Sequence, residues 1–208
     1  DVERSRGLGD VYKRQIQKIK NEKIEAKKEK FKVGFIGSLY WWQGVDILVH
    51  AVGIVRKKMD NVKLVIIGDG PLRDKIEHLC RKLKLNYCIT GYLPHEDALK
   101  MLRELDVMIL PSRKISTTET IIPIKILEAW ALGVPVVTTK HKIFIKSGFK
   151  DREHLIYCEP TSSDIAKAIL LILENEEIKR KLSQNGPKIA EKFSYDRIVQ
   201  QLLKLTNN

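Results

Sequence analysis

The sequence of 208 residues has no apolar run near the roughly 18 residues that span a bilayer, and no short apolar segment follows a basic start as in a secretory signal. Cysteine is also scarce. The three cysteines, Cys80, Cys88 and Cys158, are odd in number and lack the spacing of metal ligands, which argues against a disulfide framework and predicts no metal site. We therefore expect a cytoplasmic protein.

The charges are unequal, because 38 Lys and Arg against 26 Asp and Glu leave a net charge of +12. Outside the lead-in there is no run of five or six basic residues and no cluster of cations with interleaved aromatic residues, so nucleic acid is not an expected partner. The charge fits solvated helix faces, a phosphorylated ligand or peripheral contact with an anionic membrane at its inner face. With 43% hydrophobic and 31% charged residues, the composition is that of a globular domain rather than a disordered or collagen-like chain.

Residues 1–15 show no hydrophobic period, and the glycines within them discourage regular structure. Residues 10–15 also back-translate to a string like the transposase end used in preparing sequencing libraries. We therefore expect residues 1–15 to be a non-native or disordered tail, with a natural flexible arm as the alternative, and we expect the gene to continue upstream. Residues 16–30 form a lysine-rich lead-in, and residues 31–208 form the folded domain.

From residue 31 onward, short apolar runs alternate with amphipathic stretches. The runs are 31–36, 62–67, 87–90, 107–110, 134–137 and 155–157. Parallel strands need crossover connections, which are almost always right-handed and usually helical. Six strands separated by helices therefore predict a doubly wound, Rossmann-like α/β fold, with a parallel sheet and helices on both faces. The chain after residue 157 is predicted to be a helical C-terminal tail.

Open parallel sheets bind ligands at the carboxyl ends of their strands. Three segments follow predicted strands here, at residues 37–44, 91–95 and 112–133. The first is a glycine-bounded loop that leads into a helix, so its backbone N–H groups can meet phosphate, although it is not a six-residue Gly-x-Gly fingerprint. The third contains Pro123-Ile124-Lys125-Ile126-Leu127-Glu128-Ala129 and ends before Val134-Pro135-Val136.

This third segment resembles the hallmark of the group 1, or family 4, glycosyltransferases of GT-B architecture, a helix with Pro-x-Lys-x-x-Glu-Ala followed by Gly-x-Pro-Val. Residues 31 to about 206 resemble the C-terminal half of these enzymes, so the resemblance implies one half of a GT-B fold. The other matching motifs are Gly37-Ser38-Leu39, Trp42-Gln43-Gly44, Gly68-Asp69-Gly70-Pro71, Gly91-Tyr92-Leu93 and Leu110-Pro111-Ser112.

The resemblance also implies a function. In this family the C-terminal half holds a nucleoside-diphosphate sugar, the donor substrate, and the N-terminal half, missing here, brings the acceptor. The implied reaction is glycosyl transfer with retention to a polysaccharide, lipid-linked or glycan acceptor, without a metal ion or other cofactor. We expect the fragment alone to be inactive.

The resemblance assigns roles to residues that match the family motifs. Glu128 matches the carboxylate that hydrogen-bonds the ribose hydroxyls, and Leu93 matches the turn whose backbone meets the base. The diphosphate is expected at the loop that starts at Gly37 and at the start of the helix near Pro123. The full set expected to bind the donor is Gly37, Ser38, Leu93, Ile122, Pro123, Lys125 and Glu128.

One departure from the family pattern concerns the carboxylate that faces the sugar. The family often has a Glu eight residues before the position of Glu128, where this sequence has Thr120, with Glu119 displaced by one. The candidate catalytic residues are therefore Thr120, Lys125 and Glu119.

A second departure concerns the cations that meet the diphosphate. The family commonly has basic residues where Ser38 and Gln43 stand. Lys125, near the start of its helix, is the candidate replacement, followed by Arg113 and Lys114 in the loop.

Several alternatives stay open at this stage. The chain could be a degenerate, non-catalytic nucleotide-binding module, or half of a nucleotide-sugar epimerase of similar architecture. Glu128 could be a structural carboxylate, and Lys125 could be a surface lysine whose stem covers apolar neighbours. His95 is expected to cap its helix.

Overall fold

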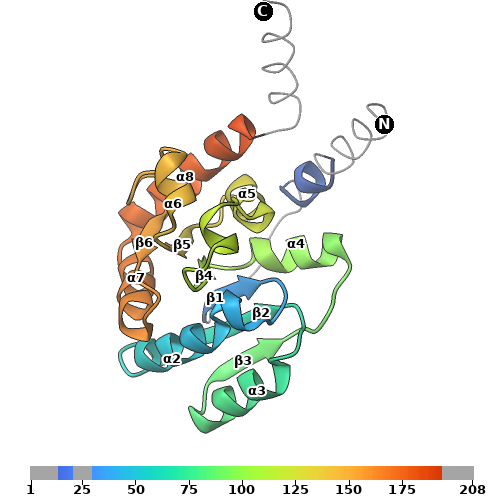
Figure 1. The fold of residues 1–208 in the computed structure, drawn as a ribbon, viewed down its shortest axis with the longest axis vertical. Coiled ribbons are helices and arrows are strands. Elements are labelled where there is room, and N and C mark those ends of the chain that lie inside the picture. Colours follow the sequence, from blue (N-terminus) through green and yellow to red (C-terminus); the bar gives the residue numbers. More distant parts are fainter. Residues whose placement is uncertain (1–13, 21–29, 194–208) are drawn as a thin grey trace, which may run out of the picture.

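The computed structural model describes residues 14–20 and 30–193. The predicted tail up to residue 13, most of the lysine-rich lead-in and the chain beyond residue 193 lie outside the described residues. Within the described part, the domain is a parallel sheet covered by helices on both faces (Figure 1). The predicted doubly wound α/β fold is confirmed.

The sheet has six strands in the order β3-β2-β1-β4-β5-β6, and all neighbours are parallel. The strands are β1 (Phe31–Ile36), β2 (Val62–Ile67), β3 (Asn86–Ile89), β4 (Val107–Leu110), β5 (Val136–Thr139) and β6 (Ile156–Cys158). All six lie within two residues of the predicted runs. β5 starts later than expected because Pro135 has no N–H group to donate to the sheet.

The two faces of the sheet carry separate apolar clusters. Along β1, Val33 and Phe35 face one cluster, while the space over Gly34 between them is filled by Leu105 of the other. This alternation buries both faces, as the nearly continuous apolar runs predict for a parallel sheet. The first cluster is covered by α2 (Val45–Arg56), α3 (Arg73–Lys82) and α7 (Ser162–Glu174). The second is covered by α4 (His95–Arg103), α5 (Ile124–Ala131), α6 (Lys142–Lys146) and the C-terminal part of α8 (Glu176–Lys192).

The described part of the C-terminal tail covers the sheet and then α5. α7 begins at the side-chain cap of Thr161, whose hydroxyl accepts a hydrogen bond from the N–H of Asp164 at 3.2 Å. α8 then crosses α5, and Gly186 permits the close approach, since a β-carbon there would lie 3.1 Å from the backbone of Trp130.

Residues 14–20 form a helical segment on the face of α4 and α5. Ile16 and Ile19 are buried there, and the guanidinium of Arg103 donates hydrogen bonds to the carbonyls of Ile19 and Lys20. The sequence places residues 14 and 15 in the tail, whereas the structure includes them in this packed helix. Among the helices described, none has the length and apolar character to cross a membrane.

Candidate functional site

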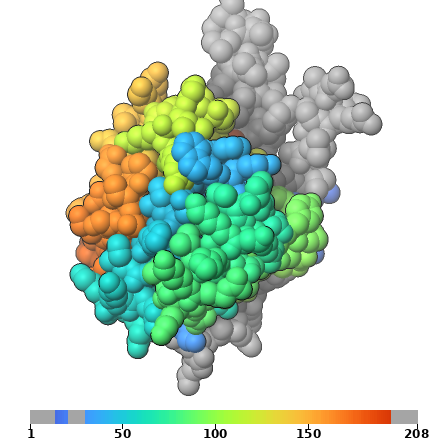
Figure 2. All heavy atoms as spheres, turned by 60° about the horizontal axis from the view of Figure 1, so that its bottom comes forward, coloured from blue at the N-terminus to red at the C-terminus, as the bar shows by residue number. Residues whose placement is uncertain are grey.

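The chain order of the strands reverses between β1 and β4, which are neighbours at the centre of the sheet. Ligands of open α/β sheets bind at the carboxyl ends of the strands at such a switch point. Here the loop after β1, with its short helix η1 (Trp41–Gln43), touches the loop after β4, because the N–H of Arg113 donates to the carbonyl of Trp42 at 2.9 Å. Figure 2 shows the blue surface of the first loop beside the yellow-green surface of the segment that leads into α5.

Lys125 lies at this point, in the first turn of α5. Its Nζ is 3.3 Å from Oε1 of Gln43 and 4.6 Å from the centroid of the Phe35 ring. Burial lowers the pKa of Lys125 to about 8, against an opposing effect of the Glu128 charge. At neutral pH the ammonium is therefore still mostly protonated, and it stands at the positive end of a helix.

Gly37 follows β1 with a φ of 134° and faces Lys125. A β-carbon at this position would overlap Nζ of Lys125, so a glycine is needed for this approach. The loop offers fewer free donors than the sequence suggests, because the N–H groups of Gly37, Leu39 and Tyr40 already donate to protein carbonyls. Among the described residues 37–40, the exposed Ser38 is the one whose N–H has no such backbone bond.

Glu128 is 5% exposed on the same helix. Its Oε1 lies 2.8 Å from Nε2 of His95, and Nδ1 of His95 lies 3.3 Å from Oε1 of Gln15. The expected cap is not formed, since Pro94 occupies the cap position of α4 without a side-chain hydrogen bond. His95 instead fixes the carboxylate of Glu128.

Glu119 and Thr120 make contacts away from Lys125. One carboxylate oxygen of Glu119 accepts from the N–H of Lys142 at 2.8 Å, and the other accepts from Nδ1 of His141 at 3.2 Å. The backbone bond to Lys142 is the main reason that the pKa of Glu119 lies below its usual value. The side chain of Thr120 is exposed. Its hydroxyl donates to the carbonyl of Thr117, in the short helix η2 (Thr117–Glu119), and to the carbonyl of Ser116 just before that helix.

A cavity of about 180 Å³ lies beside Lys125. Of the three candidate catalytic residues, Lys125 belongs to its lining, while Glu119 and Thr120 do not. The lining consists of Trp42, Gln43, Leu110, Ser112, Thr117, Thr118, Ile121, Pro123, Lys125, His141 and Phe144. Sequence reasoning missed His141, although its place just after β5, at the carboxyl edge of the sheet, is a usable signal.

The remaining predicted residues divide into two groups. Leu93 and Ile122 are half-buried against the cluster under α4 and α5, and neither lines the cavity beside Lys125. Arg113 is committed elsewhere, because its guanidinium makes two bonds to Asp46 at 3.0 and 2.8 Å and one to the carbonyl of Trp41 at 2.5 Å. Lys114 forms an exposed ion pair of 2.7 Å with Glu159. Lys125 is therefore the cation best placed for an anionic ligand.

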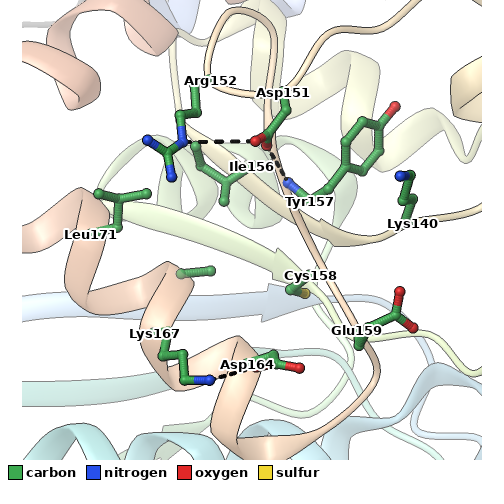
Figure 3. Close-up of a pocket in the computed structure, with 11 residues that line it drawn as sticks. Lys140, Asp151, Arg152, Ile156, Tyr157, Cys158, Glu159, Asp164, Lys167 and Leu171 are labelled. Carbon is green, nitrogen blue, oxygen red and sulfur yellow. Dashed lines mark hydrogen bonds and ion pairs between the residues drawn. The ribbon is translucent and has the colours of Figure 1, made fainter.

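A larger cavity, of about 400 Å³, lies away from the switch point, between α7 and the outer edge of β6 (Figure 3). Four of its charged side chains form two pairs: Lys167 lies 3.0 Å from Asp164, and Arg152 lies 3.8 Å from Asp151. None of the predicted site residues lines it. In the described ranges, no group of three or more His, Cys, Asp or Glu side chains is arranged to hold a metal ion.

Known proteins resemble this chain in sequence and fold. The family described as "Glycosyl transferases group 1" matches residues 16–189. An uncharacterized glycosyltransferase of Methanocaldococcus jannaschii is 28% identical over 173 residues, which are 82% of this chain and 46% of the relative. The crystal structure of TarM from S. aureus, in complex with fondaparinux, alpha-GlcNAc-glycerol and UDP, covers 90% of this chain and 37% of its own, with a TM-score of 0.74 and 25% identity.

The C-terminal domain of a glycosyl transferase group 1 family protein from Francisella tularensis has the same fold, with a TM-score of 0.69 and 22% identity. The match covers 88% of this chain and 92% of that domain. Against the relative from Methanocaldococcus jannaschii, in contrast, the chain spans about half the length. The described fold thus corresponds to one domain of a larger protein of this kind.

Proposed function

The chain belongs to the group 1 glycosyltransferase family, and we propose that it binds the nucleoside-diphosphate sugar from which the complete enzyme transfers a glycosyl group. One observation carries the proposal: the ammonium of Lys125 stands beside Gly37 at the start of α5, at the switch point of the sheet. A cation and a helix N-terminus together form a site for a diphosphate.

In this proposal the negative charge that develops on the diphosphate leaving group is met by Lys125, by the N-terminus of α5 and by the N–H of Ser38. Such preorganised charges stabilise the transition state most when water is excluded. The bond between the anomeric carbon and the diphosphate oxygen breaks, a bond forms between that carbon and the acceptor oxygen with retention, and the acceptor proton passes to the leaving diphosphate. Because protein groups oppose the charge, the transfer needs no metal ion.

Glu128 holds the nucleoside in this proposal. Its carboxylate is buried and fixed by His95, so it can accept hydrogen bonds from ribose hydroxyls without first losing side-chain freedom. The base lies against the turn at Leu93, whose neighbour Tyr92 is 86% exposed.

We infer that the acceptor site lies in another part of the complete protein, since relatives are about twice as long as this chain. Exposed aromatic side chains follow β1 and support a contact there. Trp41 is 55% exposed, and the rings of Tyr40 and Trp42 stack at 4.5 Å beside it. Such large apolar side chains at one edge of a domain indicate a surface covered by a partner or ligand.

The second candidate function is a non-catalytic nucleotide-binding module. It is favoured by the two uncharged residues at the phosphate loop, Ser38 and Gln43, and by the contact of Gln43 with Lys125. Both functions predict nucleotide binding, but only the first predicts transfer once the rest of the protein is present.

Isothermal titration calorimetry with UDP, GDP, uridine and guanosine tests the binding. We expect at least one nucleoside diphosphate to bind more tightly than its nucleoside, by about tenfold to a hundredfold, since charge-assisted hydrogen bonds contribute about 1.5–3 kcal/mol. Equal affinity for diphosphate and nucleoside would contradict a diphosphate site. Assays with the full-length protein and UDP-sugars then separate an enzyme from a module.

We also propose peripheral contact with an anionic membrane, supported by the net charge of +12. Each basic residue near such a surface contributes about 1 kcal/mol, and salt screens the attraction. Cosedimentation should therefore require anionic lipid and weaken with salt. Equal binding to neutral vesicles would argue against it.

A further inference from the structure

His141 is a buried polar residue whose hydrogen bonding is incomplete. It lies just after β5, at the cap position of α6, and is 1% exposed. Its Nδ1 is 3.2 Å from Oε1 of Glu119, whereas its Nε2 is buried and has no hydrogen-bond partner among the described residues. A buried polar atom left in this state costs about 1–3 kcal/mol, so it points to a ligand that completes the bonding.

Glu119 determines which proton the ring carries. Its carboxylate is oriented by the N–H of Lys142 and accepts from His141, so Nδ1 must carry the hydrogen. Burial lowers the pKa of His141, against the raising effect of Glu119 and with a small lowering effect of Lys114. The ring is therefore neutral at physiological pH, and Nε2 presents a lone pair that can only accept.

His141 lines the same cavity of about 180 Å³ as Lys125. Glu119, which holds the Nδ1 side of the ring, is not part of the lining, and from this we infer that Nε2 is the ring nitrogen nearer to the cavity. Two of the other lining residues, Trp42 and Phe144, are aromatic. The volume is below the range of about 300–1,000 Å³ of pockets that take a whole drug-sized ligand. It suits one ring of a ligand rather than an entire nucleotide sugar.

The chemistry of the cavity selects the part of the ligand. A lone pair on Nε2 repels a phosphate but accepts from a hydroxyl group. Aromatic walls beside hydroxyl-bearing side chains suit a sugar ring, which has apolar faces and a polar edge. Because Lys125 would hold the diphosphate at the same cavity, the sugar directly attached to that diphosphate is the one within reach.

We propose that Nε2 of His141 accepts a hydrogen bond from a hydroxyl group of the donor sugar, and that this contact discriminates among donor sugars. The proposal rests on the proposed function, because it takes the diphosphate site at Lys125 as given. In it Glu119 is a positioning residue, which acts on the sugar only through the tautomer and orientation of His141.

Two substitutions of His141 test the roles of its two ring nitrogens separately. In His141→Asn the amide replaces Nδ1, so the bond to Glu119 can be kept while the acceptor on the cavity side is lost. In His141→Gln the amide reaches the position of Nε2, so an acceptor on the cavity side can be kept while the bond to Glu119 is lost. Melting temperature reports the bond to Glu119, and affinity for the sugar reports the acceptor.

The binding experiment uses calorimetry with UDP, UDP-glucose, UDP-galactose, GDP and GDP-mannose on the parent and both variants. The affinity ratio is the affinity for a sugar nucleotide divided by the affinity for its own diphosphate. For the sugar nucleotide with the highest ratio, we expect His141→Asn to lower the ratio about threefold to tenfold. The affinity for the diphosphate alone should not change. His141→Gln should lower the ratio less while lowering the melting temperature more.

A pH series adds a readout that a purely structural role would not move. Protonation turns Nε2 from an acceptor into a donor, so the parent ratio should fall as the pH drops below the pKa of His141, which burial lowers. In His141→Asn the ratio should not depend on pH in that range. Glu119, which contacts the ring, has a lowered pKa and stays charged there, so it does not mimic the effect.

The outcomes distinguish this proposal from the proposed function. If diphosphates bind but His141→Asn leaves every ratio unchanged, the sugar contact is overturned while the diphosphate site stands. If diphosphates bind but no tested sugar nucleotide responds to the substitution or to acid, the proposal is likewise overturned. If no diphosphate binds at all, both fall.

Discussion

The ammonium of Lys125 occupies the space that a side chain at residue 37 would fill, so Gly37 and Lys125 are complementary across the switch point of the sheet. Gly37 ends β1, and Lys125 begins α5, so the contact joins the two halves of the doubly wound sheet. It also brings a cation to the first loop, where Ser38 and Gln43 stand in place of the basic residues that are common in the family.

Replacing Gly37 by alanine should displace Lys125. We expect Gly37→Ala to weaken nucleoside-diphosphate binding about tenfold or more, because the cation loses its position, and to destabilise the fold, because φ is 134°. Gly148→Ala is the matched control: its φ of 74° also disfavours a side chain, but nothing lies within 4 Å of the added carbon. Calorimetry should show normal binding by the control. If both variants bind equally well, the approach of Gly37 to Lys125 does not serve the ligand.

Removing the charge at residue 125 should improve stability and impair binding. Partial burial of an ammonium is costly, so we expect Lys125→Met to raise the free energy of unfolding by about 1 kcal/mol, or the melting temperature by about 2–4 °C. The variant should lose most of its preference for diphosphate over nucleoside. Lys114→Ala is the control, since its ion pair with Glu159 is exposed. A variant at residue 125 that kept the preference would remove Lys125 from the site.

Diphosphate binding should weaken in alkali. The pKa of Lys125 is lowered to about 8 by burial, so the ammonium is charged below that pH and loses its proton above it. A bound diphosphate raises this pKa again, and affinity should therefore fall by at most about tenfold per pH unit above pH 8. Calorimetry at pH 7 and 9.5 measures the effect. Lys125→Arg, if it binds, should show no such fall, and an identical fall in both proteins would assign the titration to another group.

The lowered pKa of Lys125 also affects folding. The free energy of unfolding should change with pH in the direction opposite to the change in diphosphate affinity. The unfolded lysine titrates near 10.5 and the folded one near 8, so between these values the unfolded chain binds more protons. Stability without ligand should therefore rise with pH across this window. Denaturant melts of the parent and of Lys125→Met provide the test, because the difference between them should shrink as the pH rises.

The carboxylate of Glu128 should matter for the ribose more than for the fold. Glu128→Gln keeps an oxygen for His95 but removes the charge, so we expect nucleoside-diphosphate affinity to fall about tenfold to a hundredfold with little change in melting temperature. His95→Ala should weaken binding less, because it frees the carboxylate without removing it. Unchanged affinity together with a large loss of stability would show that Glu128 is structural.

Much of the fold was predictable because it depends on local patterns. Apolar runs of three to six residues mark buried parallel strands, and Gly133, with φ of 72°, follows the end of α5 as a glycine typically does. The placement of Lys125 and Glu128 on one helix at the carboxyl edge of the sheet also follows from their spacing and from the strand that precedes them in the chain. The resemblance to a family then supplied the expected ligand.

The sequence by itself therefore determined the doubly wound sheet, the edge at which we propose that a ligand binds and the helix that carries Lys125 and Glu128. Only the tertiary structure decided which side chains pair there. His95 meets Glu128 across 33 residues, His141 meets Glu119 across 22, and Arg113 meets Asp46 across 67. These partners sit on loops and helices separated by whole crossovers, and no local pattern encodes how those elements pack. Packing paired His95 with a carboxylate instead of a helix end, paired Arg113 with Asp46 and brought His141 to the cavity beside Lys125.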